Sequence, residues 1–171
     1  MELLPFLRQQ ARANRLANLR LHNAMAPLTR DDFHAPRTSF FPSLAQTLNH
    51  ILEVDLYYLA ALNGEPRESQ RRDYTPHDTL DALASAQARS DERFIVLLDA
   101  WAAAQLDEVI ALHRADHIQR ERRGHVVGHL LNHQVHHRGQ AHAMLSGTAV
   151  APPQLDEFFL DYDLPRRAGE T

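Results

Sequence analysis

One stretch decides how this chain folds, GHVVGHLLNHQVHHRGQ (Gly124–Gln140). It places His125, His129, His133 and His137 at intervals of four residues. Residues four apart lie one above the other on the same face of an α-helix. Two imidazoles at that spacing can bind one metal ion. Because three overlapping pairs share the spacing, spacing alone does not select the ligands.

The apolar residues of this stretch favour one pair. In helical projection the valines and leucines form a single apolar arc, and His133 and His137 lie within or beside it. His125, His129 and His136 lie at its edge or outside it. We therefore expect His133 and His137 to point into the protein interior, where each needs a polar partner. Core histidines satisfied by hydrogen bonds, without a metal, are the alternative interpretation.

Helical periodicity extends over most of the 171 residues. It predicts four helices at about Glu2–Met25, Pro42–Leu62, Pro76–Ala104 and Gly124–Ser146. Asn63-Gly64 is a stop signal for the second of these helices. In the third, Thr75 is the expected cap and Pro76 the first helical residue. The pattern predicts an all-α fold, a four-helix bundle with long connections.

The connections between these helices are less regular. Residues 26–42 contain three prolines, residues 65–74 are polar, and residues 105–123 are ambiguous. Within the last of these, Val109–Leu112 is either a short strand or an extended connection. No composition shift marks a linker, so we expect one domain over residues 1–171 with a short tail from about residue 150. In that tail, Leu155–Tyr162 could form one helical turn.

Composition excludes several kinds of chemistry. The chain has no cysteine, and all 18 of its basic residues are arginine. Disulfides, thiolate nucleophiles, cysteine zinc sites, Schiff-base lysines and a P-loop lysine are therefore excluded. The net charge of −4 is not that of a nucleic-acid-binding protein. No apolar run is long enough for a membrane span and no signal peptide is recognisable, so we expect a cytoplasmic protein.

A metal ion held by His133 and His137 needs a third ligand from another helix. His50 is the only histidine of the helix predicted at 42–62, but it lies beside the main apolar stripe. Asp55 lies within that stripe and is a rival ligand. On the same helix, Tyr57 and Tyr58 either line a pocket or pack with their hydroxyls in water.

Three side chains are weak candidates for catalytic roles. Glu53 and Asp55 could act as a general base by their position on the helix predicted at 42–62. Arg138 follows His137 directly and either holds an anionic substrate or forms a surface salt bridge. Five other histidines are expected at the surface or in loops: His22, His34, His77, His113 and His117.

The motifs around these residues resemble the DinB/YfiT-like superfamily of metal-binding four-helix bundles. The resemblance rests on four segments: Ala13–Asn18, Ser43–Asp55, His129–Gln140 and Pro152–Asp156. It covers nearly the whole chain, and the spaced histidines followed by Arg-Gly-Gln are its most specific part. The resemblance implies one divalent metal ion per chain, most often nickel or zinc, bound by His50, His133 and His137. It also implies a homodimer.

Activities known in the superfamily include thiol S-transfer, thiol-dependent isomerisation and metal-dependent hydrolysis. Three neutral imidazoles leave a divalent ion with open positions, where the pKa of a bound water or thiol falls. We therefore expect a metal-binding protein acting on a small molecule, with an S-transferase using a low-molecular-weight thiol as the first hypothesis. A metal-dependent hydrolase and a non-enzymatic, stress-related metal-binding bundle are the alternatives.

Overall fold

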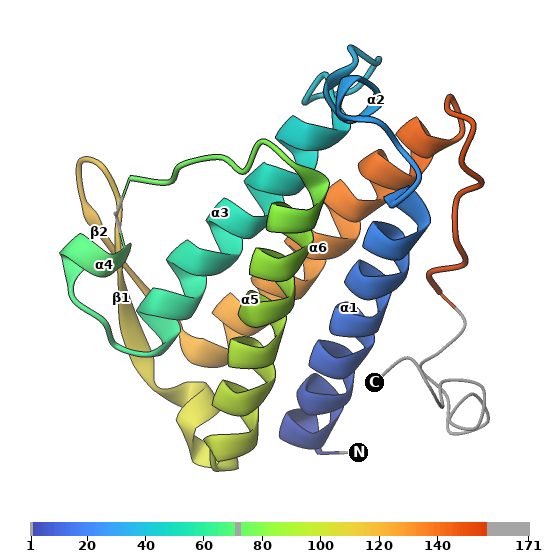
Figure 1. Cartoon of the computed structure of the whole chain (residues 1–171). Helices are drawn as coiled ribbons and strands as arrows, with labels where there is room; N and C mark the ends of the chain where they lie inside the picture. Colours follow the sequence, from blue (N-terminus) through green and yellow to red (C-terminus); the bar gives the residue numbers. More distant parts are fainter. Residues whose placement is uncertain (1, 71–72, 157–171) are drawn as a thin grey trace.

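Four long helices form the body of the molecule (Figure 1). The structure is a computed structural model, and it describes residues 2–70 and 73–156. The long helices are α1 (Leu3–Met25), α3 (Leu44–Leu62), α5 (Leu80–Ala100) and α6 (Arg123–Leu145). α1 packs on α5, α5 on α3, α3 on α6, and α6 on α1, which closes the ring. The predicted four-helix bundle is therefore confirmed. No helix in the described ranges is long and apolar enough to cross a membrane.

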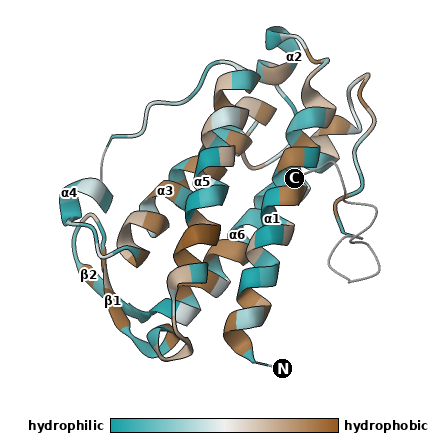
Figure 2. Cartoon of the chain, turned by 60° about the horizontal axis from the view of Figure 1, so that its bottom comes forward, coloured by the Kyte–Doolittle hydropathy of each residue, from teal (hydrophilic) through white to brown (hydrophobic). Residues whose placement is uncertain are grey.

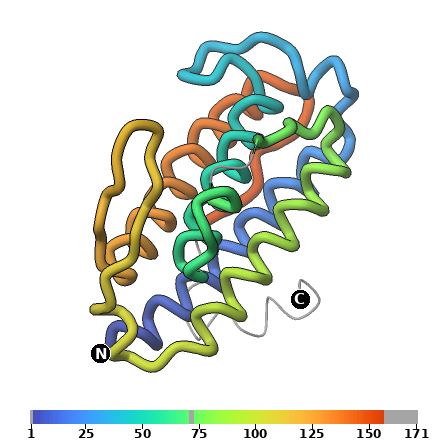
Figure 3. Tube along the Cα trace, turned by 90° about the vertical axis from the view of Figure 1, so that its left-hand side faces the viewer, coloured from blue at the N-terminus to red at the C-terminus, as the bar shows by residue number. Residues whose placement is uncertain are grey.

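Short elements occupy the three connections. They are α2 (Arg30–His34), α4 (Arg67–Gln70), the 3-10 helix η1 (Ala103–Asp107), and the strands β1 (Val109–His113) and β2 (Ile118–Arg122). β1 and β2 pair antiparallel, so the strand alternative for residues 109–112 is the correct one. β1 packs against α3 and α4, and β2 packs against α6 (Figure 3). The hairpin therefore lies over one side of the bundle, near the end of α3.

The interior of the bundle has a polar layer between two apolar clusters. Apolar and polar residues are interspersed along each long helix (Figure 2), and residues of both kinds from all four helices are buried. One apolar cluster includes Leu98, Trp101 and Val127, and the other includes Leu21 and Leu83. Between them lie buried polar side chains from all four helices: Asn14, Asn18, Asp55, Gln87, Asp91, Gln134 and Arg138. Such a layer requires each side chain to find a hydrogen-bond partner.

The start of α5 differs from the prediction. The helix begins at Leu80, and the Thr79 side chain, not that of Thr75, caps it by accepting a hydrogen bond from the Ala82 amide. The segment before it is held extended against α3 by Asn49. The Asn49 side chain accepts from the His77 amide at 2.7 Å and donates to the His77 carbonyl at 3.0 Å. This tertiary anchor removes His77 from the helix, which local capping signals could not show.

Other helix boundaries differ less from the prediction than the start of α5 does. α5 ends at Ala100, before the predicted Ala104, and the chain continues into η1. The predicted helical turn at Leu155–Tyr162 lies mostly outside the described residues, and its first two residues are not helical. At the other end of the chain, α1 and its predicted bounds agree closely.

His22 is buried, so its expected surface position is wrong. It is 7% exposed and shares the inward face of α1 with Asn18 and Met25, which are also buried. Burial lowers the pKa of His22 to about 4 from its usual 6.5. The imidazole is therefore neutral in the folded protein at neutral pH.

We expect His22 to make the protein acid-sensitive. The unfolded chain takes up a proton at His22 below pH 6.5, whereas the folded chain does so only near pH 4. Stability therefore rises with pH across this interval. Relative to His22→Gln, the free energy of unfolding of the wild type should fall by about 3 kcal/mol between pH 6.5 and pH 4. Urea titrations of both proteins at several pH values measure this, and parallel pH profiles would contradict it.

Candidate metal centre

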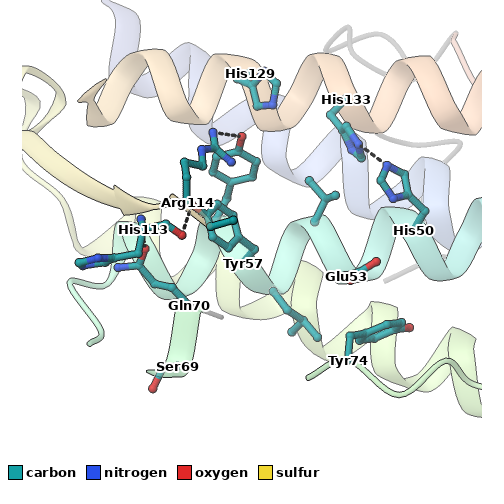
Figure 4. Close-up of a pocket in the computed structure, with 14 residues that line it drawn as sticks. His50, Glu53, Tyr57, Ser69, Gln70, Tyr74, His113, Arg114, His129 and His133 are labelled. Atoms are coloured by element: carbon teal, nitrogen blue, oxygen red, sulfur yellow. Dashed lines mark hydrogen bonds between the residues drawn. The ribbon is translucent and has the colours of Figure 1, made fainter. Parts of the chain in front are cut away.

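α3 and α6 bring three histidines together. His50 lies on α3, His133 and His137 lie on α6, and one ring nitrogen from each lies within 4.8 Å of the others. The Nε2 atoms of His50 and His133 are 3.1 Å apart, and the two rings face each other across the helix pair (Figure 4). His137 is buried and the other two are half-buried. This group could hold one metal ion.

Helix packing explains why His50 joins the pair on α6. The Ser43 side chain caps α3 by accepting from the Gln46 amide at 3.1 Å, which sets where the helix begins. α3 packs directly on α6, and His50, beside the apolar stripe, lies on the side that α6 covers. The helical projection of α3 alone left this side open to solvent or to a neighbour. The third histidine is thus supplied by the packing of two helices.

Gln140 orients one of the imidazoles. Its side-chain oxygen lies 2.8 Å from Nδ1 of His137, so that nitrogen carries the proton and donates it. The amide nitrogen of Gln140 lies 3.2 Å from Nε2 of His136, which fixes the orientation of the amide. His137 therefore presents the lone pair of Nε2 to the other two histidines. Metal-binding histidines commonly donate their second N–H in this way. Sequence reasoning did not name Gln140 as this partner, although its spacing of three residues from His137 on one helix could have indicated it.

The electrostatics of the group favour neutral imidazoles. Burial, reinforced by the neighbouring imidazoles, lowers the pKa of His133 to about 3. Burial also lowers the pKa values of His50 and His137. Neutral imidazole is the ligand form of histidine, and three such nitrogens suit zinc, nickel and other divalent transition metals. The Nδ1 atom of His133 is buried without a hydrogen-bond partner among the described residues. The donor set therefore fits the implied metal.

Phe41 covers the group from the segment that precedes α3. Its ring centroid lies 4.4 Å from that of His50 and 5.6 Å from that of His137. An apolar ring at this place excludes water from one side of the imidazoles and lowers the local dielectric. Sequence reasoning missed Phe41, because it lies outside the helices and only the folded connection carries it to the histidines.

A cavity of about 590 Å³ adjoins the histidines. His50, Glu53 and His133 line one end, and Tyr57 and Arg114 lie toward the other (Figure 4). The Arg114 guanidinium donates to the Tyr58 hydroxyl at 3.0 Å and lies 5.2 Å from the Tyr57 ring centroid. Both tyrosines thus line the cavity, one of the two alternatives that the sequence left open. Arg114 was not anticipated, because the turn of the hairpin carries it there.

The structure separates the three candidate catalytic residues. Glu53 is exposed and lines the cavity together with His50. Asp55 is buried in the polar layer, where it accepts hydrogen bonds from Gln87 and Gln134. Burial raises the pKa of Asp55 well above its usual value, and the group of three histidines does not include it.

Arg138 is neither at the cavity beside the histidines nor in a surface salt bridge. It is 7% exposed and donates from Nη1 to the side-chain oxygens of Asn14 and Asn18 on α1. Its position next to His137 turns it about 100° around α6, toward α1. The polar layer that holds Arg138 therefore holds the rotation of α6, which also directs His133 and His137.

These features define the class of protein: it is a helical bundle with a candidate three-histidine metal centre between two adjacent helices. The chain belongs to the DinB family, whose family model matches residues 5–167. This family is metal-binding, in agreement with the donor set described above.

Two known proteins illustrate the similarity. The chain is 26% identical over 145 residues to the protein named DinB of Bacillus subtilis strain 168, which covers 80% of this chain and 83% of the relative. The crystal structure of a DinB-like protein from Bacillus cereus ATCC 10987 superposes with a TM-score of 0.63. That match covers 81% of this chain and 89% of the other at 16% identity, so it supports the fold alone.

Proposed function

We propose that this protein is a divalent-metal-dependent S-transferase, in which the sulfur of a small thiol loses its proton, forms a bond to an electrophilic carbon of a second small molecule and displaces a leaving group from that carbon. The observation that carries the proposal is the cavity of about 590 Å³ that has His50 and His133 at one end and Arg114 toward the other. A chain without cysteine has no thiol of its own, so the thiol must come from a cosubstrate.

A divalent ion bound by three neutral imidazoles lowers the pKa of a thiol beside it and so supplies a nucleophile at neutral pH. The chain's own residues then bind and orient the cosubstrate. Arg114, positioned by the Tyr58 hydroxyl, offers a cation for a carboxylate of the thiol. The rings of Tyr57 and Tyr58 offer apolar faces. Glu53, at the end of the cavity beside His50, can accept the thiol proton.

Metal-dependent hydrolysis is the second candidate. Glu53 favours it, because a carboxylate that lines the same cavity as two of the three histidines can act as a general base toward water. This candidate requires turnover without a thiol. The proposal further includes nickel or zinc as the metal, a homodimer and a cytoplasmic location, which the family resemblance suggests.

Cobalt-loaded protein tests the thiol proposal. We expect glutathione and 2-mercaptoethanol each to produce a saturable near-ultraviolet charge-transfer band in the wild type and none in His133→Ala. Arg114→Gln should weaken the binding of glutathione, which carries carboxylates, by about tenfold, a loss of about 1.4 kcal/mol. It should leave the binding of 2-mercaptoethanol unchanged. A cobalt-loaded wild type with no thiol-dependent band would refute the thiol proposal and leave the hydrolase.

A further inference from the structure

A second cavity, of about 600 Å³, lies between α1, α6 and the segment 152–156. It shares no lining residue with the cavity beside the histidines. His142 of α6 holds the segment in place, because its Nε2 atom bonds to the Pro153 carbonyl at 2.9 Å. The cavity is therefore a separate feature of the fold, and nothing in the proposed thiol chemistry uses it.

Arg138 places a cation at this cavity, and its guanidinium uses only some of its hydrogen-bond donors. Nη1 makes both of its hydrogen bonds, at 2.7 Å to Asn14 and 2.9 Å to Asn18. Within residues 2–70 and 73–156, neither Nε nor Nη2 has a hydrogen-bond partner, and no carboxylate lies within 4.0 Å. Burial lowers the pKa of Arg138 only to about 10, so the group is charged at neutral pH. Neither Nε nor Nη2 is among the fully buried atoms that lack a hydrogen-bond partner, and Arg138 lines the cavity, so an acceptor in the cavity can reach them.

The open edge of Arg138 is the edge that binds carboxylates. Nε and Nη2 lie on one side of a guanidinium and donate two parallel hydrogen bonds to the two oxygens of a carboxylate. Arg30 of the same chain shows this arrangement, with Nε at 2.8 Å and Nη2 at 2.7 Å from the two oxygens of Asp78. Among the described residues, the corresponding pair of donors in Arg138 has no hydrogen-bond partner, while Nη1 is held in place. The side chain is thus pre-oriented for a carboxylate.

The walls of the cavity limit what else the ligand can carry. Ala13, Val135, Pro152 and Leu155 make much of the lining apolar. The acidic side chain that lines it is Asp156, which is exposed and accepts a hydrogen bond from Gln154. A hydrocarbon body fits the apolar walls, whereas a second negative charge would meet Asp156.

We propose that this cavity is a binding site for a small monocarboxylic acid, whose carboxylate pairs with Nε and Nη2 of Arg138 and whose hydrocarbon part contacts the apolar walls. The site is distinct from the metal centre. The polar layer lies between the two sites, because Arg138 follows His137 on α6 and its electrostatic partners include Asp91 and Asp55.

Benzoate and its neutral analogue benzamide test the site by NMR on the full-length protein. The readout is the assigned ¹⁵N–¹H correlation of the Arg138 Nε group, at constant ionic strength. We expect a saturable shift with benzoate and binding of benzamide at least about tenfold weaker, because a charge-assisted hydrogen bond contributes about 1.5–3 kcal/mol. The same titration in His133→Ala should give the same result, which excludes carboxylate binding at the metal.

Two glycines of α6 provide a matched pair of variants. Gly139 lines the cavity and Gly128 does not, and a Cβ atom at either would meet no atom of the described residues within 4 Å, apart from its own chain neighbours and nearby helix backbone. Both leucine variants should therefore fold. We expect Gly139→Leu to abolish the benzoate-dependent shift and Gly128→Leu to retain it. The proposal is overturned if benzoate causes no saturable shift, if benzamide binds equally well, or if Gly139→Leu binds as the wild type does.

Discussion

Protein purified without a polyhistidine tag or a nickel column should contain about one divalent metal ion per chain, and His133→Ala should contain none. His133 is one corner of a triangle of rings, with centroids 5.0 Å from His50 and 4.4 Å from His137, while His50 and His137 are 4.7 Å apart. Removing it leaves two imidazoles, too few to hold a transition metal in a closed site. We expect His50→Ala to behave in the same way, with losses of affinity above about 100-fold in both variants. Elemental mass spectrometry measures the content directly.

His125→Ala is the matched control, because His125 lies on the same helix at the same spacing of residues but its side chain is 72% exposed. It should keep its metal. Gln140→Ala removes the acceptor for Nδ1 of His137 and should weaken metal binding by roughly 10- to 100-fold without abolishing it. A wild type that is metal-free and takes up neither added zinc nor nickel would contradict the metal centre. A large loss of stability on chelation, without turnover of any substrate, would favour the non-enzymatic alternative.

Asp91→Ala should destabilise the folded protein by about 3–5 kcal/mol. The Asp91 carboxylate accepts hydrogen bonds from Asn14, Asn18 and Gln87 at 3.1–3.4 Å. Among the negative charges that raise the pKa of Arg138, that of Asp91 has the largest effect. Burial raises its pKa to about 6, so it is mostly ionised at pH 7. The alanine variant would leave several amide donors without their acceptor and would remove a negative charge that stabilises the buried Arg138.

Chemical denaturation at pH 7 measures this loss, and Asp99→Ala is its control. Asp99 lies on the last turn of the same helix and pairs with Arg12 at 2.6 Å, but its side chain is 41% exposed. Exposed ion pairs contribute about 1 kcal/mol or less, so the control should lose little. Equal losses in the two variants would show that the polar layer is not the stabilising feature we describe.

Much of the architecture could be predicted from local patterns. Apolar periodicity located the four long helices, and Asn63 and Gly64 marked the end of α3 correctly. The predictions failed where a distant residue outweighs a local signal. Thr75 and Pro76 form a good helix start in isolation, yet Asn49 of α3 binds the segment after them and delays α5 to Leu80. Local signals of about 1 kcal/mol are easily outweighed by such tertiary hydrogen bonds.

The candidate site divides in the same way. Spacing and the apolar arc of one helix identified the pair His133 and His137, because both depend only on the 3.6-residue period. Asp55 and His50 on α3 were both plausible third metal ligands, and the sequence of α3 alone did not favour either residue. The family resemblance chose His50. In the structure α6 covers the His50 side of α3, whereas Asp55 joins the polar layer with Gln87 and Gln134.

The sequence by itself determined which segments are helical and which two histidines share an inward face, since these properties depend on residues within a few turns of one another. The tertiary structure alone decided that Phe41 covers the histidines, that Arg114 reaches their cavity and that Arg138 turns away from it. Each of these side chains is placed by a contact with a segment distant in the chain. A single sequence carries no record of such contacts, because they arise only when the helices pack.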